Sequence, residues 1–327
     1  ATTALVRLDD EAPGVLSRVL TANPPRRQAI FAALAAREEM AGVFDVEDQS
    51  LIPMTFAEVV RHGRAADILR RAFGDVPKGL PGLLAQIGER PLPRPNDYLA
   101  LHGLLISDDP RGADALRASG RITCRKLEVL NALDPRWRHA SVLARIDTHS
   151  EAAAFNEAVA FVQSVNSKAS DEVVAEAIAR MGPTSSLPRL LDRLLRRADR
   201  LPPHPLCDGD HELRPLASVR DLLEAGRKYR NCLAHRLADV AAGKMAVGEL
   251  RGQCLVEFRP MTRGTLNQGT GWLLRDIHIE RNRPVPLALI AEVEAKCDAL
   301  GIPRIDDSGE RDGWESYRRF ARELEWG

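Results

Sequence analysis

The spacing of the hydrophobic residues changes once along this 327-residue chain, and that change limits the folds open to it. In residues 1–200, apolar side chains recur every three to four positions, which predicts amphipathic helices, and alternating runs are nearly absent. No fixed repeat accompanies this spacing, so the sequence predicts a helical domain or an irregular helical array. The helices are expected over residues 25–44, 55–73, 96–106, 114–133, 149–165, 170–181 and 187–201.

A Pro-rich segment, residues 201–215 (LPPHPLCDGDHELRP), follows these helices and is expected to be a linker. A helix is then predicted from Ser218 to about Ala242, where Gly243 ends it. Residues 216–327 should therefore form a small α+β domain with an antiparallel sheet, which makes the whole chain α+β. Strands are expected over residues 245–250, 253–259 and 272–280, and helices over residues 286–300 and 312–326.

The composition is that of an ordinary globular protein, with 44% hydrophobic and 28% charged residues. The formal net charge is zero, so any contact with a polyanion must come from local patches. Five scattered cysteines indicate reduced thiols, and no apolar run approaches the length of a membrane span. We therefore expect a cytoplasmic protein without a membrane partner. No phosphate-binding loop or dinucleotide fingerprint occurs, so no cofactor is expected.

Strand parity gathers polar residues on one face of the expected sheet, provided that residues 253–259 pair antiparallel with residues 272–280. One interpretation is a solvated face with cross-strand ion pairs. The other is the acid/base site of a hydrolase or nuclease, which requires His278 within reach of Glu257 or Asp276. The apolar face is expected to hold Cys254, Val256, Phe258, Leu273, Ile277 and Ile279. The polar face is expected to hold Glu257, Arg259, Asp276, His278 and Glu280, of which Glu257, Asp276 and His278 are the candidate catalytic residues.

Cys232 and His235 are three residues apart on the expected helix and invite two further interpretations. A zinc site with Cys254 and His278 is disfavoured, because these two residues lie on opposite faces of the sheet, and no metal is expected. A nucleophilic thiol is the second interpretation, since basic neighbours lower the pKa of a cysteine. We predict instead that Cys232 is buried and packs its helix against the sheet.

Two local stretches carry an excess of basic residues. From Arg117 to Arg145, seven basic residues oppose two acidic ones, and from Arg180 to Arg200, six arginines oppose two aspartates. Such patches either follow a phosphate backbone, with Trp137 available for stacking, or are solvated helix faces. The turn at Asn282 either adopts a left-handed backbone or lets the flanking arginines hold a phosphate. The candidate nucleic-acid contacts are Arg121, Arg125, Arg136, Trp137, Arg138, Arg193, Arg196, Arg197, Arg281 and Arg283.

An ordered set of features occupies the carboxy-terminal third of the chain. A glycine is followed by a Cys-Leu pair, a second glycine, the strand LVEF with Glu257, and a Trp-led strand that ends in Asn282-Arg283-Pro284. This order resembles the PcfJ-like family, which is named for proteins carried on conjugative plasmids. The resemblance implies a bacterial protein linked to plasmids, phages or other mobile elements, and it implies no particular reaction. The residues that carry it are Gly226, Cys232, Gly243, Trp272 and Asn282.

Three functions are compatible with these observations. The first is an accessory protein of a mobile genetic element or defence locus that binds DNA, RNA or a nucleoprotein partner through basic helical surfaces. The second is a hydrolase or nuclease that uses the polar sheet face, and the third is a protein-interaction scaffold. Salt-dependent binding of nucleic acid would favour the first function. Loss of turnover on Glu257→Gln or His278→Ala would favour the second.

Overall fold

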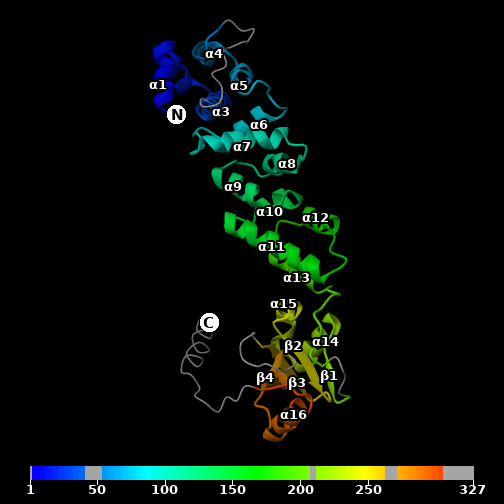
Figure 1. Cartoon of the computed structure of the whole chain (residues 1–327). Coiled ribbons are helices and arrows are strands. Elements are labelled where there is room, and N and C mark those ends of the chain that lie inside the picture. The colour runs from blue at the N-terminus through cyan, green and yellow to red at the C-terminus, as the bar shows by residue number, and fades with distance from the viewer. Residues whose placement is uncertain (1, 41–53, 207–210, 262–270, 305–327) are drawn as a thin grey trace. The chain divides into compact units, whose positions relative to one another are not determined.

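The computed structural model describes residues 2–40, 54–206, 211–261 and 271–304. It has the α+β architecture expected from the sequence, with a helical amino-terminal region followed by a four-stranded antiparallel sheet (Figure 1). The chain divides into two compact units, which are described separately. The helical unit comprises Ala1–Phe161 and Ala169–Leu191, and the sheet unit comprises Val162–Lys168 and Asp192–Gly327. The helix expected over residues 312–326 lies outside the described residues.

The amino-terminal region is built from short helices, and a longer one, Pro24–Met40, packs against three that follow it, Ala65–Phe73, Leu80–Ile87 and Pro95–Ile106 (Figure 1). None of the helices in the described ranges combines the length and the apolar character needed to cross a membrane. The helices are α1 (Thr2–Glu11), α2 (Val15–Thr21), α3 (Pro24–Met40), α4 (Phe56–His62), α5 (Ala65–Phe73), α6 (Leu80–Ile87), α7 (Pro95–Ile106), α8 (Arg111–Ala118), α9 (Cys124–Ala132), the 3₁₀ helix η1 (Pro135–Trp137), α10 (Ala140–Leu143), α11 (His149–Val165), α12 (Asp171–Ala179) and α13 (Leu187–Leu195).

The single helix expected over residues 55–73 is two helices, α4 and α5, because the chain carries two start signals. The Thr55 hydroxyl accepts a hydrogen bond from the Glu58 amide (3.3 Å), and the Glu58 carboxylate accepts one from the Thr55 amide (2.7 Å). This capping box begins α4. The Asp67 carboxylate accepts a hydrogen bond from the Arg64 amide (2.9 Å) and begins α5. The helix expected over residues 114–133 is likewise divided, into α8 and α9, by a left-handed glycine, Gly120 (φ 73°).

A buried glutamine ties α3 to α7 and to the segment that precedes α7. The side-chain amide of Gln28 donates hydrogen bonds to the carbonyls of Gly88 (2.7 Å) and Arg90 (2.8 Å). Its side-chain carbonyl accepts a hydrogen bond from the Tyr98 hydroxyl (2.7 Å), which itself accepts one from the Leu92 amide (2.9 Å). Burial raises the pKa of Tyr98 to about 12. Gln28 is fully buried, so these hydrogen bonds replace all of its contacts with water.

The sheet has the strand order β1–β2–β3–β4 with antiparallel neighbours throughout. The expected pairing of residues 253–259 with residues 272–280 is confirmed, and Glu257 lies opposite Asp276. The β2–β3 hairpin turns at Arg251 (φ 42°) and Gly252 (φ 71°), and two left-handed residues in succession are typical of a type I′ turn. The strands are β1 (Leu213–Pro215), β2 (Ala246–Leu250), β3 (Cys254–Pro260) and β4 (Trp272–His278).

The register between β3 and β4 shifts by one residue within β4. Glu257 lies opposite Asp276, whereas its neighbour Phe258 lies opposite Leu274, as at a β-bulge. Leu274 therefore packs in the apolar core with Phe258, and Leu273 lies opposite Arg259 on the other face. The expectation that Leu273 belongs to the apolar face is wrong, because an alternating pattern does not reveal a one-residue bulge.

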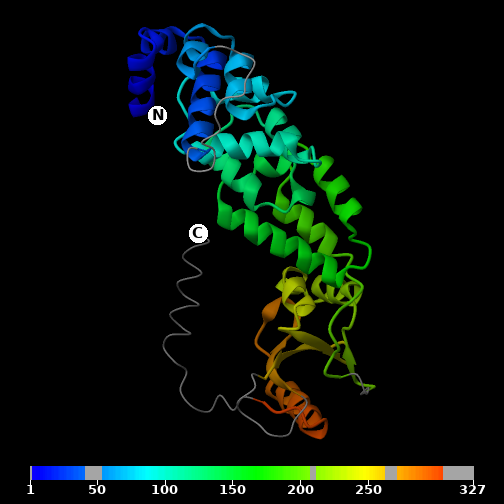
Figure 2. The same ribbon diagram turned by 45° about the horizontal axis from the view of Figure 1, so that its top comes forward.

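Both faces of the sheet are covered. On one face, Val256 and Phe258 pack with Val293 and Cys297 of α16 (Leu287–Ala299), which is the orange-red helix in Figure 2. On the other face, α14 (Val219–Tyr229) lies against the sheet, since the hydroxyl of its last residue donates a hydrogen bond to Glu249 (3.0 Å). The expectation of a solvated polar face is therefore wrong at Glu257, whose exposed fraction is 6%.

The segment expected to be a linker, residues 201–215, contributes a strand and a core residue to the sheet unit. Its last three residues form β1, which pairs with β2, and Leu206 is buried in the core behind the sheet. Residues 201–215 approach β2 closely at Gly248. A Cβ atom added there would lie 2.9 Å from Leu206 Cδ1 and 3.3 Å from Leu213 Cδ1. A larger residue at this position would displace the ends of the Leu206 and Leu213 side chains, so residues 201–215 pack closely on the sheet.

The helix expected from Ser218 to about Ala242 is three shorter pieces. They are α14, the 3₁₀ helix η2 (Cys232–His235) and α15 (Leu237–Ala241). Arg230, with a left-handed backbone (φ 49°), ends α14. The Asn231 side chain then caps η2 by accepting a hydrogen bond from the Leu233 amide (3.1 Å). Gly243 (φ 68°) ends α15, as the sequence predicts.

Candidate functional site

The structure brings the three candidate catalytic residues together on the sheet face that α14 covers. Glu257 lies on β3, and Asp276 and His278 lie on β4. The Nε2 atom of His278 is 3.4 Å from Glu257 Oε2 and 3.9 Å from Asp276 Oδ2. The distance that an acid/base interpretation requires is therefore present between His278 and Glu257.

Glu257 is ionised in a buried position because three cationic groups surround it. Burial opposes the charged form, but His278, Arg259 and Arg236 together outweigh burial and lower the pKa of this carboxyl. The Arg259 Nε atom donates a hydrogen bond to Glu257 Oε1 (2.7 Å). The position of the Glu257 carboxylate is thus fixed by side chains from β3 and β4 and influenced by the segment that follows η2.

His278 is disposed to carry a proton. The hydrogen bond to Glu257 raises its pKa, burial opposes that shift, and the negative charge of Asp276 adds to it. Its side chain keeps an exposed fraction of 29%, so a solute can reach the ring. An imidazole that is oriented by a carboxylate and holds its proton more tightly than a free histidine can donate or accept a proton in catalysis.

Left-handed residues gather where α14 meets the turn after β4. The 3₁₀ helix η3 (Glu280–Asn282) contacts α14, and the Arg230 Nε atom lies 3.7 Å from the Glu280 carboxylate. Arg230 (φ 49°), Arg281 (φ 59°) and Asn282 (φ 51°) all have left-handed backbones, which are costly for residues other than glycine. Asn282 is among the residues that tolerate this conformation best, so its geometry fits a turn residue.

The residues that carry the PcfJ-like resemblance have separate structural roles. A Cβ atom added to Gly226 would lie 3.3 Å from the Ala234 amide nitrogen, so this glycine lets η2 pack closely on α14. Cys232, the first residue of η2, is exposed, and the prediction that it is buried is wrong. The reason is the break at Arg230, which turns Cys232 away from the direction that a continuous helix would give it.

A second buried carboxylate, Glu249 on β2, was not anticipated from the sequence. It accepts hydrogen bonds from Lys228 (2.7 Å), Arg214 (3.0 Å) and Tyr229 (3.0 Å). Burial opposes its ionisation, but these three donors lower the pKa of the Glu249 carboxyl. The sequence contained a signal for this position of Glu249, namely the Arg251-Gly252 turn. This turn fixes the β2–β3 register and places Glu249 on the same face as Glu257. Glu249 is surrounded by its donors and connects α14 to β1 and β2.

Two of the candidate nucleic-acid contacts are held by other groups of the protein. Trp137 is 2% exposed, so its ring is not available to stack on a base, contrary to the expectation from the sequence. Arg136 lies over that ring, and its guanidinium forms ion pairs with Asp134 (2.6 Å) and Asp171 (2.9 Å). The η1 turn therefore buries the aromatic residue and neutralises the arginine beside it.

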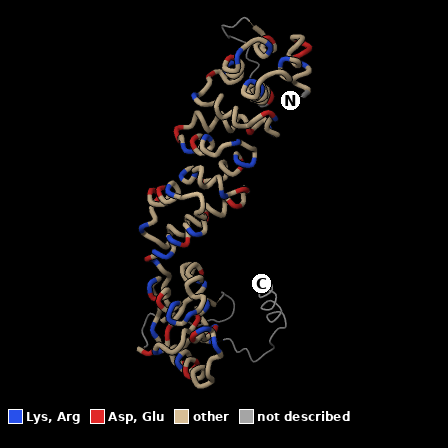
Figure 3. Tube along the Cα trace, turned by 180° about the vertical axis from the view of Figure 1, so that it is seen from behind, with Lys and Arg blue, Asp and Glu red and all other residues tan. Residues whose placement is uncertain are grey.

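The remaining candidate arginines fall into two groups. Arg196 pairs with Asp192 (2.8 Å), and Arg281 lies 3.8 Å from the Glu280 carboxylate. Basic and acidic residues are interspersed along the helices (Figure 3). Within the described ranges, six candidates have no carboxylate within ion-pair distance: Arg121, Arg125, Arg138, Arg193, Arg197 and Arg283.

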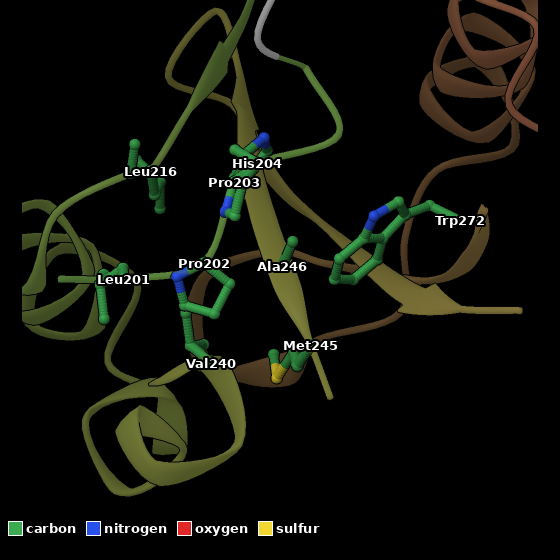
Figure 4. Close-up of a pocket in the computed structure, with 10 residues that line it drawn as sticks. Leu201, Pro202, Pro203, His204, Leu216, Val240, Met245, Ala246 and Trp272 are labelled. Carbon is green, nitrogen blue, oxygen red and sulfur yellow. The ribbon is translucent and has the colours of Figure 1, made fainter. Parts of the chain in front are cut away.

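A small pocket in the sheet unit lies beside the chain that precedes β1 (Figure 4). Trp272 and Ala246 line it together with His204, whose ring is fixed by two backbone groups. The His204 Nε2 atom lies 2.8 Å from the Val247 carbonyl, and its Nδ1 atom accepts a hydrogen bond from the Leu206 amide (3.1 Å). The volume of the pocket, about 10 Å³, has room for a single water. The pocket is therefore too small to be a ligand site.

The candidate site contains acid/base groups, and the described ranges contain no group of three or more His, Cys, Asp or Glu residues arranged to hold a metal ion. Comparisons with protein-family models, with curated proteins and with solved structures found no match for this chain.

Proposed function

We propose that the protein binds nucleic acid, or a nucleoprotein partner, through exposed arginines on its helices. In this proposal it acts as an accessory protein of a bacterial mobile genetic element or defence locus, as the resemblance to the PcfJ-like family implies. The observation that supports the binding proposal is that four exposed arginines are not paired with carboxylates in the described part of the chain. Arg121, Arg125, Arg193 and Arg197 have no carboxylate partner in the described part of the chain, so their charges are available to phosphates.

The number of cations supports a modest electrostatic affinity rather than tight binding. Each phosphate neutralised on duplex DNA contributes roughly −0.9 to the slope of log affinity against log salt concentration. Two arginines therefore contribute roughly −1.8 to that slope, a difference that titrations at several salt concentrations resolve. Contacts to phosphates carry no sequence information, so binding through these arginines should be independent of sequence.

The test compares double variants that remove equal charge. Arg121→Ala/Arg125→Ala and Arg193→Ala/Arg197→Ala should each weaken binding of a fluorescent oligonucleotide and flatten the salt slope by roughly 1.8. The control is Arg117→Ala/Arg180→Ala, which removes two exposed arginines that pair with Asp114 (2.5 Å) and Glu176 (2.5 Å). Equal losses in all three variants would show that only net charge matters. If the unaltered protein does not bind the oligonucleotide at low salt, the result would favour the interpretation as a protein-interaction scaffold.

The contact between His278 and Glu257 supports a second candidate function, hydrolysis or nuclease activity by acid/base catalysis. The 3.4 Å contact orients an accessible imidazole, and the hydrogen bond to Glu257 raises the pKa of His278, so the ring holds its proton more tightly than a free histidine. Oligonucleotides should then be cleaved with a pH dependence that disappears in His278→Ala, and Glu257→Gln should slow cleavage. Turnover that is unchanged in His278→Ala would eliminate this function.

A further inference from the structure

The helical unit contains a pocket that sequence reasoning did not anticipate. It lies among α8, η1, α10 and α12, which contact one another, and it has a volume of about 420 Å³. This volume falls within the roughly 300–1,000 Å³ that is usual for small-molecule sites. Four of the residues that line it are alanines, namely Ala115, Ala118, Ala140 and Ala175. Small side chains from three helices leave the space open, and they give it an apolar wall.

One wall of the pocket is the flat guanidinium of Arg136, which two carboxylates hold in place. Asp134 binds Arg136 through two hydrogen bonds, from Nε (2.9 Å) and from Nη2 (2.6 Å), and Asp171 binds its Nη1 atom (2.9 Å). The guanidinium carbon lies 5.0 Å from the centre of the Trp137 ring. A guanidinium that is fixed in orientation and backed by an aromatic ring is a surface on which a nucleobase stacks.

A second cation in the pocket is not neutralised in this way. The Arg138 Nε atom donates a hydrogen bond to the Leu130 carbonyl (3.1 Å), and the side-chain stem packs against Gly112, where an added Cβ would lie 3.6 Å from Arg138 Cδ. These contacts fix the direction of the side chain. Its terminal amino groups have no carboxylate at ion-pair distance in the described residues, so they can bind an anion.

A histidine next to Arg138 offers a further donor. The His139 Nδ1 atom accepts a hydrogen bond from the Ser141 amide (3.1 Å). In the neutral ring the proton is therefore on Nε2, which is a donor. The acidic residue that lines the pocket, Asp114, is paired with Arg117 (2.5 Å), and Arg111 lies 3.8 Å from Asp109. Arg138 and His139 are thus the groups best placed to hold a phosphate.

We propose that this pocket binds a nucleoside monophosphate unit, with its base stacked on Arg136 and its phosphate held by Arg138 and His139. The alanine wall excludes water from the sugar and the edge of the base. The same chemistry has two sources, a free mononucleotide and an unpaired nucleotide of a single strand. The second source rests on the proposed nucleic-acid binding, and the first does not.

The test measures binding of adenosine 5′-monophosphate to the full chain by calorimetry, with adenosine and inorganic phosphate as partial ligands. The mononucleotide should bind at least about tenfold more tightly than either part, because it uses both subsites. Ala175→Leu, which fills the pocket, and Arg138→Gln, which removes the charge, should each weaken binding by about tenfold or more. Ala154→Leu, an exposed position in α11, is the matched control and should bind normally.

Two results would overturn the proposal. One is the absence of mononucleotide binding at millimolar concentration, and the other is unchanged affinity in both Ala175→Leu and Arg138→Gln. Arg138→Gln keeps the test valid if the larger side chain in Ala175→Leu impairs folding. A single-stranded oligonucleotide then separates the two sources, since it should lose affinity in Ala175→Leu only if a strand enters the pocket. Mononucleotide binding that persists in Arg121→Ala/Arg125→Ala would show that the pocket is independent of the proposed polyanion surface.

Discussion

Two histidines of the sheet unit have pKa values shifted in opposite directions, and each shift follows from its immediate partners. His204 is surrounded by apolar groups, and burial lowers its pKa although the Val247 carbonyl opposes the shift. His278 faces Glu257, and the hydrogen bond between them raises its pKa. Membership of the same unit therefore does not decide the direction in which the pKa of a histidine shifts. The nearest carboxylate or its absence does.

These shifts predict opposite dependences of stability on pH. Below pH 6.5 unfolded His204 gains a proton that the folded residue resists, so its contribution to stability falls as the pH falls. The contribution of His278 is complete below pH 6.5 and is lost as the pH rises through its raised pKa. The urea concentration at the midpoint of unfolding is measured between pH 5 and 8.5. Its decline towards acid pH should disappear in His204→Gln, and its decline above pH 6.5 should disappear in His278→Gln. The reverse pattern would contradict both assignments.

Gln28 provides a second prediction at the residue scale. Gln28→Leu leaves the half-buried carbonyls of Gly88 and Arg90 without their donor and the buried Tyr98 hydroxyl without its acceptor. We expect a loss of about 2–4 kcal/mol in the free energy of unfolding, measured by urea titration. Gln86→Leu is the control, because the Gln86 side chain donates one hydrogen bond, to Arg117 (3.2 Å), and should change stability little. A smaller loss in Gln28→Leu than in the control would refute this account.

At the scale of elements, the sequence predicted the regular pairings and missed the single-residue irregularities. Alternation in residues 253–259 and 272–280 was enough to predict β3 against β4 and to place Glu257 and His278 on one face, but it did not predict the contact between them. The bulge in β4 and the break at Arg230 were missed because apolar spacing continues across each of them. The burial of Trp137 was missed because a basic neighbourhood does not reveal which way a side chain points.

Two glycines predict opposite effects of the same substitution. Gly103 lies inside α7 with nothing within 4 Å of an added Cβ, so Gly103→Ala should raise stability by about 0.5–1 kcal/mol. Gly248 lies in β2 where an added Cβ would be 2.9 Å from Leu206, so Gly248→Ala should lower stability by about 1–3 kcal/mol. Thermal unfolding of both variants checks the signs. Stabilisation by Gly248→Ala would show that Leu206 does not seat the 201–215 segment on the sheet.

At the scale of the whole molecule, each unit has a hydrophobic core of its own. In the helical unit Val15, Ile30 and Ile68 belong to one buried cluster, and in the sheet unit Val256 and Phe258 belong to another. Separate cores predict separate cooperative transitions. Calorimetry should therefore show two transitions, one lowered by Gln28→Leu and the other by Gly248→Ala. One transition that both variants lower would mean that the units unfold as one.

The division between the units also bears on how such a chain can be inherited. Because Val162–Lys168 belongs to the sheet unit while the residues on both sides of it belong to the helical unit, the polypeptide passes between the units three times. A recombination event with one breakpoint cannot exchange either unit intact, and a break at residue 200 leaves parts of the sheet unit on the helical fragment. Exchange of either unit intact therefore requires a breakpoint at each of its three boundaries, after residues 161, 168 and 191.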